Sequence, residues 1–469
     1  MHSQKISFMQ PAIDFDRELI VRYDGKGPRY TSYPTADRFV TGLSQASHVE
    51  SLMRRTPGAL AMPLSLYFHL PFCNTVCYYC GCNKIITKDQ TKADQYLDYL
   101  TQEVQMYGVL MPNRPAVSQL HLGGGTPTFL SHDQLQRLMD VVNAHFTLQK
   151  NGEYSIEIDP RKVGEDTIKH LAGLGFNRMS VGIQDFNPEV QIAVNRVQSE
   201  AETRTVIEAA RMYGFRSVSV DLIYGLPKQS AASIAETIER VLLLKPDRIA
   251  LYNYAHLPER FMPQRRINAD ELPSAEVKLD ILQNSIEQLT QAGYVLIGMD
   301  HFALPNDDLA VAQRRGRLQR NFQGYSTHAD CDLLAFGVSS IGKVGASYFQ
   351  NVKTLDEYYA KLDQQLFPVE RGLTMNRDDV IRRAAIQALM CQFQLFYQPF
   401  EAGYMIDFAE YFAEELRLLQ PLVVDGLVEL ESDGIFVTPK GRMLIRSIAM
   451  VFDAYLRTKA TKARYSQLI

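Results

Sequence analysis

Four of the six cysteines of this chain lie close together in the segment PFCNTVCYYCGCNK, residues 71–84. Three residues separate Cys73 from Cys77, two separate Cys77 from Cys80, and one separates Cys80 from Cys82. In a reducing compartment, clustered cysteines are typically metal-binding or catalytic rather than disulfide-bonded. The segment therefore predicts a metal or redox site.

The spacing favours an iron–sulfur cluster over a structural zinc ion or a disulfide, which remain the alternatives. Structural zinc takes two separated ligand pairs, but the other two cysteines, Cys331 and Cys391, stand alone. A four-iron cluster is bound by thiolates, and one held by only three keeps an iron open. The Cys-x3-Cys-x2-Cys spacing resembles the signature of radical S-adenosylmethionine (SAM) enzymes. We interpret Cys73, Cys77 and Cys80 as the cluster ligands, with SAM on the open iron.

Cys82 and Tyr67 are the candidate catalytic residues. Cys82 follows Cys80 too closely for a tight loop to turn both onto one cluster, so we predict a non-ligand near the site, and a purely structural thiol is the alternative. Tyr67 lies two residues before His69 in an apolar run, and strand alternation places both on one face. We expect this face to point into the site.

The elements that position these residues are six short apolar or β-branched runs that alternate with amphipathic helical stretches. The runs are residues 64–70, 117–125, 154–159, 178–184, 217–227 and 248–258. Strands that alternate with helices predict βαβ units and a parallel sheet. Each run ends in polar residues or glycines, as in barrels whose sites lie at the carboxyl ends of the strands. We predict an α/β fold with an incomplete TIM-like (β/α)6 barrel; an open doubly wound sheet is the alternative.

The residues at these strand ends suit SAM. The glycines of GGGTPT, residues 123–128, would let the backbone approach and hydrogen-bond an amino-acid group. Glu157 and Asp159 suit ribose hydroxyls or an ammonium group, and Arg196 offers a planar fork for a carboxylate. Taken singly, each has an ordinary alternative, namely a tight turn, a solvated strand end or a weak salt bridge. The dinucleotide fingerprint Gly-x-Gly-x-x-Gly is absent from this stretch.

The sequence predicts four regions. Residues 1–60 read as an N-terminal strap, because the prolines and small residues of GPRYTSYPTA prevent a long helix. Residues 61–310 carry the barrel pattern, and residues 311–369 read as a connector with a loop that faces the site. Residues 370–469 read as a mostly helical C-terminal domain that ends in a module resembling a winged helix.

The composition is ordinary for a globular protein: 46% hydrophobic residues, 22% charged residues and a formal net charge of -4. This balance disfavours bulk nucleic-acid binding. The first 20 residues lack the pattern of a signal peptide, and we found no uncharged apolar run of about 18 residues. We therefore expect a cytoplasmic protein without a membrane span, and a monomer by default.

Taken together, the motifs resemble the oxygen-independent coproporphyrinogen III oxidases of haem biosynthesis almost from end to end. The resemblance rests on GPRYTSYPTA, YFHLPFCNTVCYYCGCNK, KADQYLDYL, LHLGGGTPT, IEIDPR, GFNRMSVGIQDFN, VQIAVNR, DLIYGLPKQ, YNYAHLP, GMDHFA and NFQGYSTH. It implies one [4Fe-4S] cluster and two SAM molecules on an incomplete barrel, covered by a helical C-terminal domain.

The resemblance also implies contacts to each SAM molecule. Those to the cluster-bound SAM are Tyr67, Gly124, Glu157 and Ile341. Those to the second SAM are Tyr79, Gly125, Thr126, Gln184, Arg196, Asp221 and Ala255. The family often has Phe at the position of Tyr79, so only the packing role of this ring carries over.

The implied reaction is the oxidative decarboxylation of two propionates of coproporphyrinogen III to vinyls, which gives protoporphyrinogen IX. An electron from a reduced flavodoxin- or ferredoxin-type donor enters the cluster, SAM splits to a 5′-deoxyadenosyl radical, and this radical takes a hydrogen from the propionate. A substrate with four carboxylates needs cationic partners, for which arginine is geometrically selective. Arg29 in the strap and Arg320 in RRGRLQR, residues 314–320, are the candidates.

Two other functional classes remain possible at this stage. A haem-chaperone paralogue shares the barrel and the cluster motif, but the CGC ending at Cys82 and the strap both belong to the oxidase pattern. Nucleic-acid binding through the C-terminal module would use its basic residues, Arg442, Arg446, Arg457, Lys459, Lys462 and Arg464.

Overall fold

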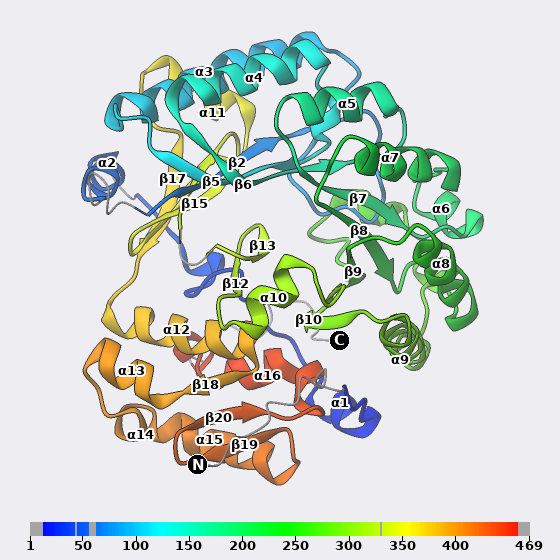
Figure 1. The fold of residues 1–469 in the computed structure, drawn as a ribbon, viewed down its shortest axis with the longest axis vertical. Helices are drawn as coiled ribbons and strands as arrows, with labels where there is room; N and C mark the ends of the chain where they lie inside the picture. The colour runs from blue at the N-terminus through cyan, green and yellow to red at the C-terminus, as the bar shows by residue number, and fades with distance from the viewer. Residues whose placement is uncertain (1–12, 43–44, 56–61, 329–330, 458–469) are drawn as a thin grey trace.

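The computed structural model describes residues 13–42, 45–55, 62–328 and 331–457. Its centre is a curved sheet that contains the six predicted strands, in chain order and all parallel (Figure 1). They are β2 (Leu64–Leu70), β5 (Ala116–Gly124), β6 (Thr147–Ile158), β7 (Arg178–Gln184), β8 (Ser217–Tyr224) and β9 (Arg248–Asn253). Because the strands are parallel, their carboxyl ends share one edge of the sheet.

Helices connect successive strands and cover the outer face of the sheet (Figure 1). They are α3 (Thr91–Leu110), α4 (His132–His145), α5 (Glu165–Gly173), α6 (Pro188–Ala193), α7 (Glu200–Met212), α8 (Ala231–Leu243) and α9 (Ala275–Gln291). Capping boxes at Ser131, Ser199 and Ser230 satisfy free backbone N–H groups where α4, α7 and α8 begin. Local sequence thus sets where these three helices start.

The sheet continues beyond the six strands on both sides. Next to β2 lie β14 (Asp332–Phe336), which is parallel to it, and then the antiparallel strands β15 (Ile341–Val344), β16 (Ser347–Asn351), β17 (Val369–Thr374) and β1 (Val40–Thr41). Next to β9 lie β11 (His301–Ala303) and β10 (Val295–Gly298). Among the described strands β1 and β10 lie at the two ends of the order and do not pair with each other, so the barrel is incomplete, as predicted.

The residues expected to form a connector, 311–369, add β14, β15 and β16 to the main sheet, and β17 of the same sheet crosses the expected boundary between residues 369 and 370. The remaining elements of this part are α10 (Asp308–Arg314), β12 (Gln319–Asn321), β13 (Gly324–Ser326) and α11 (Leu355–Asp363). Part of the expected connector thus forms strands of the main sheet. This is physically reasonable, because alternating apolar residues can join any open sheet edge, and the edge of β2 was available.

The C-terminal region packs as a separate layer below the barrel (Figure 1). It contains α12 (Arg377–Gln392), β18 (Gln394–Phe396), α13 (Tyr397–Tyr404), α14 (Phe408–Tyr411), α15 (Ala413–Val424), β19 (Val428–Glu431), β20 (Gly434–Val437) and α16 (Ile445–Met450). The hairpin of β19 and β20 forms around the SDG turn, as expected from the sequence. In the strap, α1 (Arg17–Tyr23) lies beside this layer, and α2 (Gln45–Met53) lies beside the barrel (Figure 1).

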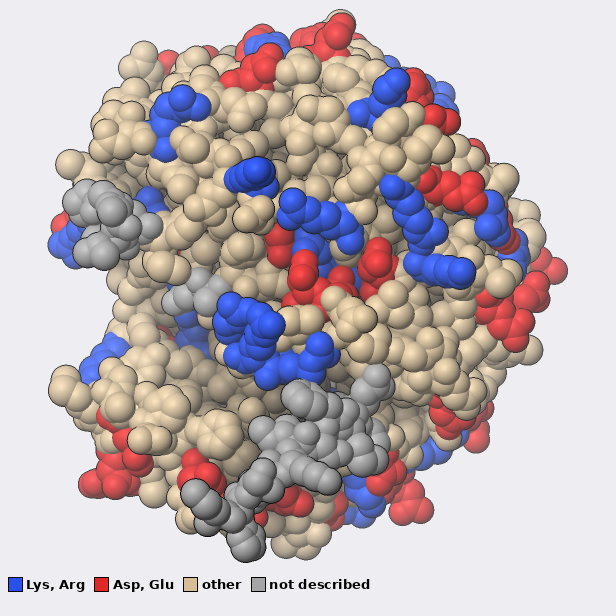
Figure 2. Space-filling view, viewed as in Figure 1, with Lys and Arg blue, Asp and Glu red and all other residues tan. Residues whose placement is uncertain are grey.

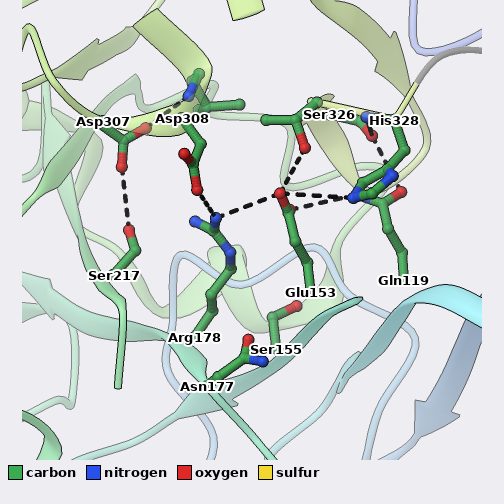
Figure 3. A network of polar contacts seen from close by, with 12 residues as sticks. Gln119, Glu153, Ser155, Asn177, Arg178, Ser217, Asp307, Asp308, Ser326 and His328 are labelled. Atoms are coloured by element: carbon green, nitrogen blue, oxygen red, sulfur yellow. Dashed lines mark hydrogen bonds and ion pairs between the residues drawn. The ribbon is translucent and has the colours of Figure 1, made fainter. Parts of the chain in front are cut away.

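A polar network occupies the amino-terminal end of the parallel strands (Figure 3). Arg178 at the start of β7 pairs with Glu153 of β6 and with Asp308 of α10. Ser217 Oγ of β8 lies 3.3 Å from Asp307 Oδ2, and Arg248 Nε of β9 lies 2.9 Å from the Asp307 carboxylate. These contacts hold α10 across this end, which leaves the carboxyl ends for a site.

Candidate active site

A cavity of about 300 Å³ lies at the carboxyl ends of the parallel strands, against the cysteine segment. It brings together most of the residues that sequence reasoning selected. Those that line it are Cys73, Cys77, Tyr79, Cys80, Cys82, Gly124, Gly125, Thr126, Glu157, Gln184, Arg196 and Asp221. Their convergence follows from the parallel sheet, because residues more than 140 positions apart in the chain end at the same edge.

The cysteine segment is a loop closed by a short two-stranded ladder. In this ladder β3 (Phe72–Cys73) pairs with β4 (Ile85–Ile86). Donors from distant parts of the chain hold its carbonyls: Asn195 Nδ2 lies 2.7 Å from Val76 O, and Gln264 Nε2 lies 2.9 Å from Tyr79 O. The loop geometry is therefore set by its surroundings.

The thiols of the loop differ in their electrostatic environment. Burial raises the pKa of Cys73 to about 11. A hydrogen bond with Cys82, helped by the Lys84 ammonium group, lowers the pKa of Cys80 to about 6. The same hydrogen bond raises the pKa of Cys82 well above its ordinary value. Cys82 thus lies beside a proposed ligand rather than away from the site.

The donor set fits a cluster that SAM completes. Within the described parts of the chain, no three His, Cys, Asp or Glu side chains converge as they would on a single metal ion. The three thiols instead face a cavity that also carries the carboxylates of Glu157 and Asp221 and the guanidinium group of Arg196. Acidic and basic groups together suit the amino-acid and ribose parts of SAM.

Glycine is required at Gly124 and Gly125, at the end of β5, by the packing of neighbouring residues as well as by the expected approach of a ligand. A Cβ atom at Gly125 would lie 2.7 Å from the backbone C and O atoms of Pro71, and one at Gly124 would lie 2.6 Å from the His69 ring. Gly124 also has a φ of +115°, which disfavours other residues. Close packing of the cysteine loop on β5 therefore requires glycine here, even though both residues line the cavity.

Glu157 and Asp221 sit in contrasting environments on β6 and β8. Burial works against ionisation of Glu157, but a hydrogen bond with His121 and one from Gly124 N at 3.1 Å leave its pKa lowered. Burial raises the pKa of Asp221 to about 7, and its contact with Ser180 Oγ at 3.0 Å compensates only in part. The two carboxyl groups therefore differ in their readiness to ionise.

Asp159, which also lines the cavity, contacts two arginines. Its carboxylate receives Arg161 Nη2 at 2.6 Å and Arg196 Nη1 at 3.3 Å. The same two guanidinium groups contact Cys77 Sγ, at 3.8 Å from Arg161 and 3.7 Å from Arg196. Arg161 was missed by sequence reasoning, although it directly follows the IEIDP strand end.

Five residues proposed for the site do not line this cavity. Tyr67 lies behind it, with its hydroxyl 3.1 Å from His69 Nδ1 and its ring stacked on His121. Ala255 lies in the loop after β9. Ile341 of β15 packs against a cluster around Phe39, Tyr348 and Met375.

Arg29 and Arg320 are the other two, and the structure brings them together. Arg320 Nε donates to Arg29 O at 3.2 Å. Arg29 forms an ion pair with Asp300 and lies 5.7 Å from the ring centre of Tyr252, which does line the cavity. Burial, together with the charge of Arg320, lowers the pKa of Arg29 to about 10. The pair thus forms a cationic group next to a residue of the cavity wall, with Arg320 buried and the Arg29 side chain 35% exposed.

Comparisons with known proteins agree with this geometry. Residues 67–241 match the Radical SAM superfamily model, and residues 375–444 match the HemN C-terminal domain model. The chain is 52% identical to the oxygen-independent coproporphyrinogen III oxidase of Escherichia coli (strain K12), over 97% of this chain and 99% of that protein. It is 51% identical to that of Pseudomonas aeruginosa, over 98% and 100%. The chain belongs to the oxygen-independent coproporphyrinogen III oxidase family.

A solved structure supports the same conclusion for the fold. The structure described as "Coproporphyrinogen III oxidase (HemN) from Escherichia coli is a Radical SAM enzyme" superimposes with a TM-score of 0.90 at 51% identity, and covers 95% of this chain and all of that one. The predictions of family, fold class and radical SAM enzyme are confirmed. Members of this radical SAM family use a [4Fe-4S] cluster and SAM.

Two basic residues of the C-terminal module, Arg446 and Arg457, make internal contacts. Arg446 is 5% exposed and donates to Pro28 O at 3.1 Å, and Arg457 pairs with Glu414 and Glu415. Lys459, Lys462 and Arg464 lie outside the described residues. On the face seen in Figure 2, basic and acidic side chains are interspersed, in keeping with the small net charge. Of the helices in the described ranges, none has the length and apolar character that a membrane span requires.

Proposed function

We propose that the chain carries out the reaction of its family, the oxygen-independent oxidative decarboxylation of two propionates of coproporphyrinogen III to vinyls in haem biosynthesis. The observation that supports this proposal most strongly is the cavity in which three closely spaced thiols face carboxylate and guanidinium groups. Identities of 51–52% over nearly the whole of each chain support the assignment.

Cys73, Cys77 and Cys80 would hold the cluster. When bound, the cluster and SAM supply an electron and a carbon-centred radical that removes hydrogen from a propionate. Glu157 and Asp221 accept N–H or O–H donors at the cavity wall, and Arg196 binds a carboxylate. The positive φ of Gln184, +67°, holds its strand end in an unusual conformation at the cavity.

The family resemblance supports two SAM molecules, and the cavity lining includes two of the four contacts of the first set and six of the seven of the second. Glu157 and Gly124 of the first set adjoin Arg196 and Asp221 of the second. In the absence of direct contacts at the cavity, Tyr67, Ala255 and Ile341 would act from behind it or after the site closes on its ligands.

Arg29 and Arg320 would take substrate carboxylates. Arg320 is 4% exposed, and among the described residues its Nη1 atom makes no hydrogen bond. A buried guanidinium group with a free donor favours an anionic partner. The pair lies next to Tyr252 at the cavity wall, which suits a large macrocycle whose reacting arm enters the cavity while other propionates stay outside.

The test is the single exchange of each proposed ligand for Ala in anaerobically reconstituted protein. Cys73→Ala, Cys77→Ala and Cys80→Ala should each lose the brown chromophore and reduce SAM-dependent formation of protoporphyrinogen by at least about a thousandfold. Cys82→Ala is the matched control and should retain its iron and sulfide. A full iron complement in any of the three variants would refute the ligand assignment, and haem binding without product formation would favour a chaperone.

A further inference from the structure

One proposed cluster ligand, Cys77, has guanidinium groups beside its sulfur, whereas the cation beside Cys80 is the Lys84 ammonium group. Cys77 Sγ contacts two guanidinium groups, Arg161 Nη2 at 3.8 Å and Arg196 Nη1 at 3.7 Å. Cys73 Sγ receives only the neutral hydroxyl of Thr126, at 3.4 Å, among its described hydrogen bonds. Cys77 is therefore the corner of the proposed cluster site that guanidinium groups contact.

A carboxylate opposes this charge from the same place. Asp159 accepts from both Nε and Nη2 of Arg161, at 2.9 Å and 2.6 Å, and from Arg196 Nη1 at 3.3 Å. All three side chains are largely buried, with side-chain exposures of 19%, 15% and 8% for Arg161, Asp159 and Arg196. Buried charges interact more strongly than charges in water, because solvent screens them less.

Charge next to a ligand sulfur changes how readily a cluster accepts an electron. Reduction adds negative charge to the cluster and its thiolates, so an N–H donor or a positive group stabilises the reduced state. A carboxylate at the same distance has the opposite effect. Arg161 and Asp159 therefore act on Cys77 with opposite signs.

We propose that Arg161 and Asp159 are positioning residues that set the reduction potential of the cluster through Cys77. Arg161 raises the potential by donating to the sulfur and by its charge, while Asp159 lowers it and holds both guanidinium groups in place. Arg196 contributes as well, but it is also a proposed SAM contact, and Gln198 and Gly182 O hold it on its other side. The proposal rests on the ligand assignment made above, because the effect passes through Cys77.

The experiment is a redox titration of the reconstituted cluster without SAM or substrate, followed by electron paramagnetic resonance. Arg161→Gln should shift the midpoint potential to a more negative value. At the midpoint potential of the unmodified protein, the ratio of reduced to oxidised cluster should be roughly three- to tenfold lower in Arg161→Gln than in the unmodified protein. Asp159→Asn should shift the midpoint in the opposite direction.

Lys162→Gln is the matched control, because it removes the same charge one residue away. The Lys162 side chain is exposed and has no contact with a cysteine sulfur among the described hydrogen bonds. The midpoint potential of the cluster in Lys162→Gln should stay near that of the unmodified protein. Equal shifts in Arg161→Gln and Lys162→Gln would show a general charge effect and overturn the proposal, as would shifts of the same sign in Arg161→Gln and Asp159→Asn.

Arg161→Lys keeps the charge and covers the case in which the Gln variant assembles no cluster. It should hold iron and show a smaller negative shift, because the charge remains but the planar fork to Asp159 and the sulfur is lost. Loss of iron in both Arg161 variants would overturn the proposal in favour of a structural role. Absence of a four-iron cluster from the unmodified protein would instead refute the proposed function.

Discussion

Two carboxylates of the cavity differ because their hydrogen-bond partners differ. Glu157 has a histidine and a backbone N–H group as partners, whereas Asp221 has one serine hydroxyl. Hydrogen bonds to the charged form offset the desolvation of Glu157 but only partly that of Asp221. Asp221, with a pKa of about 7 against an ordinary value of 3.8, is therefore the carboxyl group that titrates near neutral pH.

The pH dependence of stability should show this difference. Between pH 4 and pH 7 the folded protein keeps a proton on Asp221 that the unfolded chain has lost, so Asp221 lowers the free energy of unfolding as pH rises to about 7. Asp221→Asn removes this effect. We compare the free energy of unfolding of this variant with that of the unmodified protein, both without ligands. The difference should be about 2 kcal/mol more favourable to the variant at pH 8.5 than at pH 4.5. It should be smaller than the full pKa shift implies, because water in the cavity screens the carboxylate.

Urea unfolding at the two pH values measures this gain. Asp140→Asn is the control, because Asp140 is exposed on α4 and bonds only to exposed Gln136 in the described structure. A gain of the same size in the control, or a constant difference between Asp221→Asn and the unmodified protein at both pH values, would contradict the assignment.

Gly125 provides a second residue-scale prediction, because packing rather than ligand approach requires it. Gly125→Ala places a Cβ against the backbone of Pro71, so it should push the cysteine loop off β5 and cost about 2–4 kcal/mol. Its iron content after reconstitution should fall as well. Gly173→Ala in α5, where a Cβ meets no atom within 4 Å, should be neutral or stabilise the protein by up to about 1 kcal/mol. Thermal unfolding and iron analysis compare the two.

At the scale of elements, α10 closes the end of the barrel opposite the site. Arg178 is the centre of the contact, with its side chain 7% exposed between Glu153 and Asp308 (Figure 3). Asp308 is 62% exposed, whereas Glu153 is 15% exposed. The inner pair is therefore less well screened than the outer pair.

Removal of Arg178 should be far more costly than removal of its outer partner. Arg178→Ala leaves the buried Glu153 carboxylate without its cation and should lower the free energy of unfolding by about 3–5 kcal/mol. Asp308→Asn breaks only the exposed pair and should cost about 1 kcal/mol or less. Urea unfolding of both variants tests this, and equal losses would show that α10 is held by its packing instead.

At the scale of the whole molecule, the N-terminal strap joins the barrel to the C-terminal layer. Arg446 of α16 donates to the carbonyls of Gly27 and Pro28, and Tyr30 OH donates to Asp453 at 2.9 Å. On the barrel side, Arg29 pairs with Asp300 beside β11. The strap thus places Arg29, one of the two proposed substrate arginines, between two layers.

Loss of the Arg446 contacts should loosen the strap before it unfolds the barrel. In Arg446→Ala, amide hydrogen exchange in residues 27–34 should accelerate roughly tenfold or more, because two carbonyl partners are lost. Exchange in β5 and β6 should change little. Arg417→Ala, at an exposed position of α15, is the control. Uniform acceleration throughout the chain would show that the strap is part of the global folding unit.

The sequence by itself determined the features that are local in the chain. The cysteine spacing selects the proposed cluster ligands, because three cysteines with this spacing lie within eight residues. The six parallel strands follow from alternating short runs and helices, and the carboxyl-end rule then gathers Glu157, Gln184 and Asp221 into one cavity.

Only the tertiary structure decided contacts between segments whose approach no local pattern encodes. Arg161 and Arg196 meet Cys77 across 84 and 119 residues, and β14 joins β2 although the chain between them spans the whole barrel. The need for glycine at Gly125 is likewise set by Pro71 from another strand end. Such contacts depend on how the packed sheet curves and which edge remains open, and these properties belong to the assembled fold rather than to any segment.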